Sequence, residues 1–400
     1  MIPQQVERRA RWVLDSIGAR TLAIGDVIPY HPEAWGAIER GERPEGDAVA
    51  EAFYDLARIE ELGAPLDEHG RFGALWSSLD PFDPPLERLR LELGVEPPSW
   101  DGATFVVALT HDVDSVRRWT QIGLRGAAAR LKTDVVTRRA QAAAKEAKAL
   151  ALAPLHKLRG TDPNWRFEQI VAETRRHGAA SCTFFVLGGH GDPHDGAAPE
   201  VYEQLRPRLV ELLRGLDVEI GLHGSYRTAR DHSLLADEKR RLDRLGAHVV
   251  GQRYHYLRVD PHRNLEALAD LRLRYDSTLG FADSLGFRAG IARPFHPWDL
   301  EIDEPLDIVE LPLAVMDVTL AEPRYLGAAP RSAWPILERL LDWAAANHAA
   351  FAVLWHPDRF DPATAGGWDG LYFRLVDAVH ERGGRCMSAA ELVELWLAEA

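Results

Sequence analysis

The feature that most constrains the fold is an apolar run that ends in charge, Phe105-Val-Val-Ala-Leu-Thr-His-Asp112-Val-Asp114. A continuous apolar run of this length is typical of a strand that is buried on both faces of a parallel sheet. Charge at the end of such a strand is costly to bury unless it is paired or binds a metal. In α/β barrels the carboxyl ends of the strands carry the catalytic groups. Asp112 and Asp114 are two residues apart, so in an extended strand their side chains would point to the same face and could share one site. The alternative is a helix cap or a turn, where Asp is also favoured.

Short apolar runs recur from residue 101 onward, and helical patterns separate several of them. This alternation predicts parallel strands with helices outside. Because seven strands are too many for a small open sheet, we expect an α/β fold, an incomplete barrel with its mouth at the carboxyl ends of the strands. The predicted strands are 105–109, 182–187, 218–222, 248–251, 274–277, 308–316 and 351–355.

Two segments depart from this rhythm. Residues 1–100 are expected to form an N-terminal cap or extension, and residues 101–400 the barrel, with Pro-rich linkers between them. An Ala-rich insertion at about residues 115–160 is predicted to be helical and carries eleven Lys and Arg against only Asp134 and Glu146. The plain interpretation is a solvated helical hairpin. The alternative is a basic surface that contacts anionic lipid or an acidic polysaccharide.

Composition excludes several classes of protein. A formal charge of −14 argues against nucleic acid as the main partner. Cys182 and Cys386 lie far apart, which excludes a Cys-rich zinc site and fits a reducing compartment. The N-terminus has no apolar core typical of a signal peptide, and no apolar run of about 18 residues predicts a transmembrane helix, so we expect a soluble cytoplasmic protein.

Polar side chains follow several of the predicted strands. His223 comes directly after one, Arg253, His255 and Tyr256 follow the next, and His356 follows the last. One such histidine is more often structural, but side chains at the ends of several strands of one barrel converge on a single mouth. Carboxylate and imidazole groups together form a set that can hold a divalent cation and exchange protons.

The order of these groups resembles the polysaccharide deacetylases, the NodB-homology or carbohydrate esterase 4 family, in a divergent branch. The resemblance covers roughly residues 101–395. It rests on Thr110-His-Asp112-Val-Asp114, Thr183-Phe-Phe-Val-Leu-Gly188, His223, Arg253-Tyr-His-Tyr256 and Leu354-Trp-His356. It implies a distorted seven-stranded barrel, a divalent metal that is usually zinc, and removal of N-acetyl groups from amino sugars of a bacterial polysaccharide or its precursor.

The resemblance implies Asp114 and His223 as metal ligands. The family usually has a second histidine four residues after the first, but here that position is Arg227, which stays protonated and cannot bind a metal. His255, at the neighbouring strand end, is the best replacement, and His232 is a weaker one. His194, His262 and His380 are expected to lie at the surface.

The resemblance also implies the groups that carry the reaction. Asp112 corresponds to the base that activates water, and Arg253 to the residue that pairs with and orients it. The backbone amide near Tyr256 corresponds to the oxyanion donor, and His356 to the acid that protonates the leaving amine. Asp317 and Asp358 are equal candidates for the carboxylate that supports a charged His356.

Two other classes of function stay open. One is a hydrolase of another C–N bond, in a cyclic amide or a ureide, for which a closed small pocket would speak. The other is a catalytically inactive carbohydrate-binding relative, suggested by the missing second histidine. Trp298, Trp355 and Trp368 near strand ends favour stacking on a sugar, although tryptophan is more often a core residue.

Overall fold

A nine-stranded parallel sheet forms the centre of the computed structural model, which describes residues 2–24, 30–138, 140–196, 198–361 and 365–399. Eight strands follow the order β8-β5-β4-β3-β2-β1-β10-β9, and β11 pairs with β1. The two edges of the sheet, β8 and β9, are separated along the chain only by Leu311 and Pro312, so the sheet curls round on itself at this segment. The strands are β1 (Val106–Val113), β2 (Thr183–Leu187), β3 (Glu219–Gly224), β4 (Gly251–Tyr254), β5 (Tyr275–Asp276), β8 (Val309–Glu310), β9 (Leu313–Met316), β10 (Ala350–Leu354) and β11 (Arg385–Met387); β6 (Trp298–Asp299) and β7 (Glu304–Pro305) form a separate antiparallel pair.

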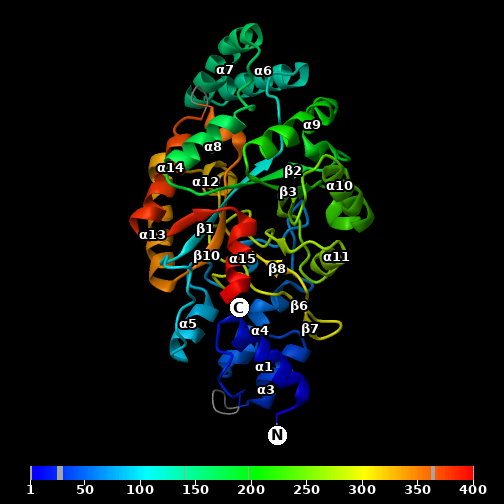
Figure 1. Ribbon diagram of the computed structural model, residues 1–400, viewed down its shortest axis with the longest axis vertical. Helices are drawn as coiled ribbons and strands as arrows, with labels where there is room; N and C mark the ends of the chain where they lie inside the picture. Colours follow the sequence, from blue (N-terminus) through cyan, green and yellow to red (C-terminus); the bar gives the residue numbers. More distant parts are fainter. Residues whose placement is uncertain (1, 25–29, 139, 197, 362–364, 400) are drawn as a thin grey trace.

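Helices surround this sheet (Figure 1). Their apolar faces pack on the strands, as the alternation of strand and helix predicts. They are α8 (Phe167–Arg176), α9 (Pro199–Gly215), α10 (His232–Arg244), α11 (Asn264–Asp270), α12 (Asp317–Ala321), α13 (Pro330–Asn347), α14 (Trp368–Glu381) and α15 (Ala389–Glu399).

The α/β fold is confirmed as a half-barrel of parallel strands with surrounding helices, but the strand count differs from the expected seven. Residues 308–316 were expected to form one strand, and they form two, because Pro312 has no N–H to donate to a neighbour. A strand was expected at residues 248–251, but β4 begins only at Gly251 and runs to Tyr254. It cannot begin at His248, because that residue adopts a left-handed φ of 52° that an extended strand does not allow.

Strand β1 extends beyond its apolar run as far as Val113, and every residue in it is buried. Side chains therefore alternate between the two faces of the sheet even at its polar end. His111 points away from the mouth: its Nδ1–H donates to the carbonyl of Trp355 at 2.7 Å, and burial lowers its pKa to about 4. His111 is thus a neutral structural residue, and Asp112 faces the opposite side.

The N-terminal segment packs against one end of the barrel. Trp12 and Phe53 contact Trp298, with ring centroids 5.0 and 5.6 Å apart. Glu61 forms a buried ion pair with Arg288 at 2.6 Å, so burial of these charges is compensated within the interface. The helices of the N-terminal segment are α1 (Gln4–Ser16), α3 (Pro32–Glu39), α4 (Ala48–Leu56) and α5 (Pro85–Glu92).

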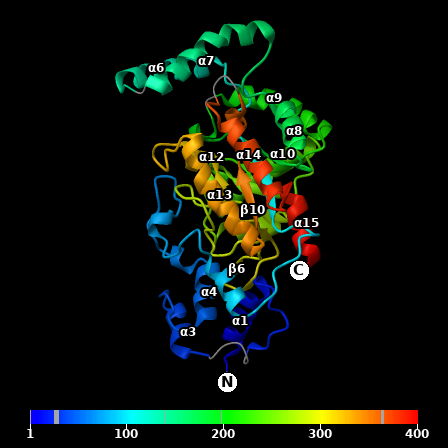
Figure 2. The ribbon, with the colours of Figure 1, turned by 90° about the vertical axis from the view of Figure 1, so that its left-hand side faces the viewer.

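The insertion after β1 forms a helical hairpin, α6 (Gln121–Val136) and α7 (Ala140–Arg159), as its composition predicts. Figures 1 and 2 show the hairpin standing at the opposite end of the molecule from the N-terminus, outside the barrel. Arg139 lies outside the described residues. Among the described helices, none combines the length and the hydropathy needed to cross a membrane.

Candidate functional site

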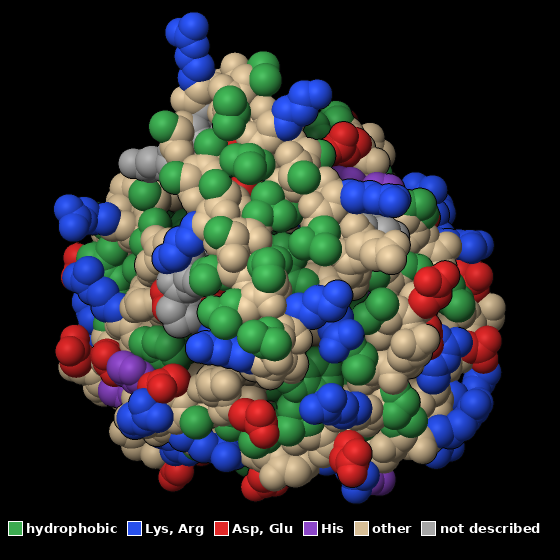
Figure 3. All heavy atoms as spheres, turned by 90° about the horizontal axis from the view of Figure 1, so that it is seen from above, with side chains coloured by type: hydrophobic (Ala, Val, Ile, Leu, Met, Phe, Trp, Pro, Cys, Tyr) green, Lys and Arg blue, Asp and Glu red, His purple; other side chains and the backbone are tan. Residues whose placement is uncertain are grey.

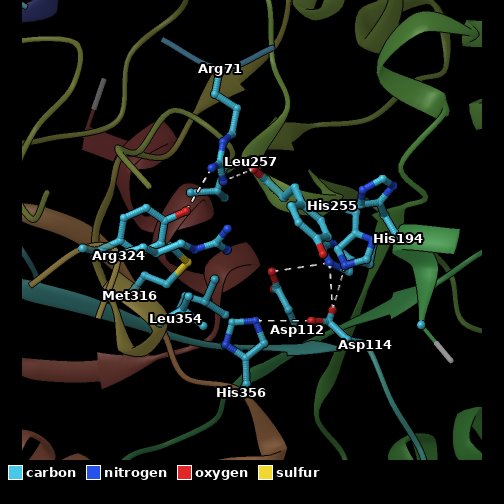
Figure 4. A pocket seen from close by; sticks show the side chains of 15 residues that line it. Arg71, Asp112, Asp114, His194, His255, Leu257, Met316, Arg324, Leu354 and His356 are labelled. Carbon is cyan, nitrogen blue, oxygen red and sulfur yellow. Dashed lines mark hydrogen bonds and ion pairs between the residues drawn. The ribbon is translucent and has the colours of Figure 1, made fainter. Parts of the chain in front are cut away.

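Except for Arg253, which is fully buried behind Asp112, the side chains selected from the sequence line a cavity of about 310 Å³ at the carboxyl ends of the strands. Asp112 lies in β1 and Asp114 directly after it, while His223 belongs to β3 and His255 follows β4. His356 follows β10 and approaches Asp114 from a different side than His255 does (Figure 4). The parallel arrangement brings these residues together because all of their strands end at the same rim.

Asp114, His223 and His255 form a group that can hold a metal ion, since one donor atom of each lies within 4.8 Å of the others. Asp114 Oδ1 is 3.3 Å from Nε2 of His223 and 3.5 Å from Nε2 of His255. The replacement of the missing histidine at position 227 by His255 is therefore consistent with the geometry. His232 contacts Asn264 instead and is not part of this group.

Both imidazoles are oriented by their other nitrogen. His223 donates from Nδ1 to the backbone carbonyl of Arg253 at 2.9 Å, and His255 donates from Nδ1 to Asp195 at 3.1 Å. Each ring thereby turns Nε2 towards Asp114, which is how metal-binding histidines are commonly held. Nε2 of His223 and Oδ1 of Asp114 are buried and have no hydrogen-bond partner. A carboxylate oxygen and an imidazole nitrogen that both lack a hydrogen-bond partner and lie 3.3 Å apart are suited to bind one divalent cation.

The charges in this group reinforce one another. Burial acts to raise the pKa of Asp114, but the neighbouring imidazoles of His255, His223 and His356 outweigh it and hold that pKa well below its usual range. Burial acts to lower the pKa of His255, and the carboxylates of Asp114 and Asp195 outweigh it and raise that pKa to about 9. The same negative potential that favours a proton on His255 would attract a metal ion.

Asp112 is held by a buried arginine, as expected. Nη1 of Arg253 donates to Asp112 Oδ1 at 2.9 Å and to Oγ1 of Thr110 at 2.8 Å. The rest of the Arg253 guanidinium donates to the backbone carbonyl and hydroxyl of Ser277, at 2.7 and 3.0 Å. The ion pair is almost fully buried, so this carboxylate is fixed in one orientation at the edge of the cavity.

His356 is paired with Asp317, which decides between the two candidate carboxylates. Nδ1 of His356 donates to Asp317 Oδ1 at 2.7 Å, and its backbone N–H donates to Oδ2 at 3.2 Å. Burial acts to lower the pKa of His356, but Asp317 outweighs it and raises the pKa to about 10, with smaller effects from Asp114 and Asp112. His356 thus carries a proton that Nε2 directs into the cavity, 3.5 Å from Asp114 Oδ2.

Tyr256 lines the cavity in a left-handed conformation, with a φ of 63°. Its carbonyl accepts a hydrogen bond of 3.0 Å from Nη1 of Arg71, which comes from the N-terminal segment. Arg71 also donates to the hydroxyl of Tyr325 at 2.9 Å. The loop that would supply the oxyanion donor is therefore tied to a part of the chain in which the sequence shows no chemical signature.

Sequence reasoning missed three groups of the cavity. Asp195, fully buried, orients His255, and it follows no predicted strand. Arg71 lies in a loop of the N-terminal segment. The prediction that His194 lies at the surface is confirmed, since 43 % of its side chain is exposed, but its ring also lines the cavity and stacks on Tyr226 with centroids 4.2 Å apart. The glycines at positions 188, 189 and 191, shortly before His194 and Asp195, are a sequence signal for this loop. A Cβ at Gly188 or Gly189 would lie 2.5 Å from Glu238, so glycine is needed where the loop passes close to α10.

The tryptophans expected to stack on a sugar do not face the cavity. Trp355 is fully buried, and Trp298 and Trp368 are 3 % and 6 % exposed. Trp298 packs on Trp12 and Phe53, and Trp368 packs on Trp355. All three are core residues, so the sugar-stacking interpretation of these tryptophans is wrong.

No protein-family model and no curated protein matches this chain. A Mycobacterium smegmatis protein provisionally described as a polysaccharide deacetylase has a similar structure, with 20% sequence identity and a TM-score of 0.47 over 76% of this chain and 94% of its own. The allantoinase PuuE is similar over 76% of this chain and 95% of its own, with 13% identity and a TM-score of 0.47.

Proposed function

We propose that this protein is a metal-dependent hydrolase of non-peptide C–N bonds that removes N-acetyl groups from amino sugars of a polysaccharide or its precursor. The observation that carries the proposal is the division of one cavity into two sets of groups. Asp114, His223 and His255 offer donor atoms for a cation, and Asp112 and His356 are held at its edge by Arg253 and Asp317. Hydrolysis of an amide needs both sets, because water is a poor nucleophile and an amine is a poor leaving group.

Each side chain has one task in the reaction. Asp112, oriented by Arg253, takes a proton from the attacking water. The tetrahedral oxyanion is stabilised by the backbone amide near Tyr256, whose loop Arg71 holds in place. His356, protonated and held by Asp317, gives its proton to the leaving nitrogen.

The metal would be held by Asp114, His223 and His255. The chemistry that a divalent ion, most simply zinc, supplies there is Lewis-acid polarisation of the amide carbonyl. Asp195 behind His255 and the Arg253 carbonyl behind His223 would keep both imidazoles in the required tautomer.

One observation favours a second candidate, a hydrolase of a small cyclic amide or ureide. The cavity of about 310 Å³ is at the lower end of the range for ligand pockets, and none of the tryptophans at the strand ends lines it. A small substrate would fill such a cavity without an extended groove.

The test is a release assay on the metal-loaded protein. N-acetylated glycans and nucleotide sugars are assayed for acetate release, and cyclic amides and ureides for ring opening or ammonia. The proposal expects acetate release that a chelator abolishes and added zinc restores. Turnover of the second group alone would establish the small-amide hydrolase, and metal binding without turnover of either would establish an inactive relative.

A further inference from the structure

The α6–α7 hairpin carries a charge opposite to that of the whole chain. Residues 117–159 hold eleven Lys and Arg and two acidic residues, in a chain with a formal charge of −14. Glu146, one of the two acids, is already bridged by Arg118 at 3.3 Å and Arg130 at 2.9 Å. Besides Arg130, which pairs with Glu146, the exposed cations of this segment are Arg117, Arg125, Lys132, Arg138, Lys148, Lys157 and Arg159.

Large apolar side chains of the hairpin also face solvent. Val135 is 60 % exposed, Val136 73 % and Leu158 84 %. A hairpin that served only to be solvated would not need branched aliphatic residues at such positions. In Figure 3, which looks at the molecule from the hairpin end, hydrophobic side chains gather among Lys and Arg and few acidic side chains lie near them.

A hollow of about 730 Å³ lies at the base of the hairpin, where α6 begins and α7 ends. Leu124, Leu150 and Trp119 give it an apolar wall. Arg117, Lys157 and Asp162 also line it, and the Asp162 carboxylate accepts hydrogen bonds from the backbone of Arg118 and Trp119. Nε1 of Trp119 is buried without a hydrogen-bond partner, so a donor is available there. The apolar wall suits the acyl chain of a lipid. The cations and the unpartnered N–H of Trp119 suit its anionic headgroup.

We propose that the α6–α7 hairpin docks on the surface of a bilayer that contains anionic phospholipid. Charge alone would equally suit a soluble acidic polysaccharide. The exposed Val135, Val136 and Leu158 distinguish the two, since aliphatic side chains gain free energy in a bilayer interface and not on a hydrated polyanion. This inference does not depend on the proposed reaction.

The hairpin is fixed close to the site. Asp114 is separated from the first residue of α6 by six residues. Asp162 accepts hydrogen bonds from the backbone of Arg118 at 2.8 Å and of Trp119 at 3.0 Å, which clamps the base of the hairpin to the segment that leads back to the barrel. A bilayer bound by the hairpin would therefore lie near the mouth of the cavity.

The test is cosedimentation of the full chain with vesicles of phosphatidylcholine, with and without phosphatidylglycerol. Wild-type protein should bind only the anionic vesicles, and binding should weaken as NaCl rises from roughly 0.05 to 0.5 M. Reversing four hairpin charges should lower the partition coefficient on the order of 100- to 1000-fold. The reversed residues are Arg125→Glu, Lys132→Glu, Arg138→Glu and Lys148→Glu.

A second variant, Val135→Ser with Val136→Ser and Leu158→Ser, keeps every charge and should weaken binding about tenfold or more. Two control variants change matching side chains elsewhere on the surface and should bind as the wild type does. They are Arg240→Glu with Arg263→Glu, Arg272→Glu and Arg331→Glu, and Leu66→Ser with Leu75→Ser and Ile302→Ser.

Three results would overturn the proposal. They are salt-insensitive binding by wild type, equal losses in the control variants, or full binding by the serine variant together with capture of a soluble polyuronate. The last result would assign the hairpin to an acidic polysaccharide. Because the salt series needs only wild-type protein, misfolding of a variant leaves the proposal open to refutation.

Discussion

The cavity contains two adjacent sets of similar residues that differ in their hydrogen bonding, which we call the proton-transferring side and the metal side. On the proton-transferring side Asp112 and His356 each have a close charged partner, Arg253 at 2.9 Å and Asp317 at 2.7 Å. On the metal side Asp114 and His223 leave one buried polar atom each without a hydrogen-bond partner, although His223 Nε2 lies only 3.6 Å from Asp112 Oδ2. Buried polar atoms are rarely left in this state, because each costs about 1–3 kcal/mol.

The difference indicates a division of labour. A group that gains or loses a proton in each cycle must be held in place by neighbours that do not react, as Arg253 and Asp317 hold Asp112 and His356. A metal-binding histidine needs a ring that is held through one nitrogen and a free lone pair on the other nitrogen. The predictions below are ordered by the size of their expected effects, and those on the cavity would break or sharpen this division.

Asp112→Asn should lower kcat about 10²–10⁴-fold, because the base is lost. The change is nearly isosteric, and Arg253 still has an oxygen to donate to, so the fold should be kept. Steady-state kinetics on the substrate found by acetate release is the measurement. Near wild-type turnover would remove Asp112 from the proton-transferring side.

His356→Ala should affect two substrates differently. An unactivated N-acetyl amide needs a proton on its leaving nitrogen and should react about 10²–10⁴-fold more slowly, whereas an activated aryl acetate should lose much less. Asp317→Asn should reproduce part of the loss on the amide, and Asp358→Asn, at an exposed neighbour, should not. Equal losses of His356→Ala on both substrates would make His356 a ligand or a structural residue.

Asp195→Asn should weaken metal binding about 10–100-fold without removing a ligand, since His255 loses the carboxylate that orients it. Competition with a chromogenic chelator measures this affinity. Asp192→Asn, in the same loop but paired with His194, is the matched control and should bind metal as the wild type does. Unchanged affinity in Asp195→Asn would separate His255 from the metal side.

Glu238 should make the free energy of unfolding fall as pH rises, whereas most carboxyl groups make it rise. Burial raises its pKa to about 7, while its carboxyl accepts from the backbone N–H of Ser225 at 3.0 Å. The folded state then binds more protons than the unfolded state between about pH 4.5 and 7, so the free energy of unfolding falls as pH rises through this window, by up to about 3 kcal/mol. Urea denaturation at pH 5 and 8 should show a smaller fall in Glu238→Gln. An equal fall in both proteins would mean that Glu238 is ionised in the fold.

Much of the site could be predicted from sequence because its residues stand next to strand ends. Asp112, Asp114, His223, Arg253, His255 and His356 each border or belong to a strand, and parallel strands of one barrel share a rim. Only local patterns were needed to place them, since the sheet itself brings them together.

Contacts between distant segments could not be predicted in this way. Asp195 reaches His255 across 60 residues, and Arg71 reaches the Tyr256 carbonyl across 185. Neither residue stands in a periodic pattern, and each position is fixed by packing of loops on the barrel. The shift of β4 has a similar cause, because the left-handed His248 depends on how its loop enters the sheet.

The most direct test of the central claim is the metal content of three purified variants beside the wild type, measured by elemental analysis after dialysis against zinc. The account predicts about one equivalent in the wild type and in Asp112→Asn, and strongly reduced content in Asp114→Asn and His255→Ala. Loss of the ion from Asp112→Asn, or full retention by His255→Ala, would contradict the division of the cavity into a metal side and a proton-transferring side.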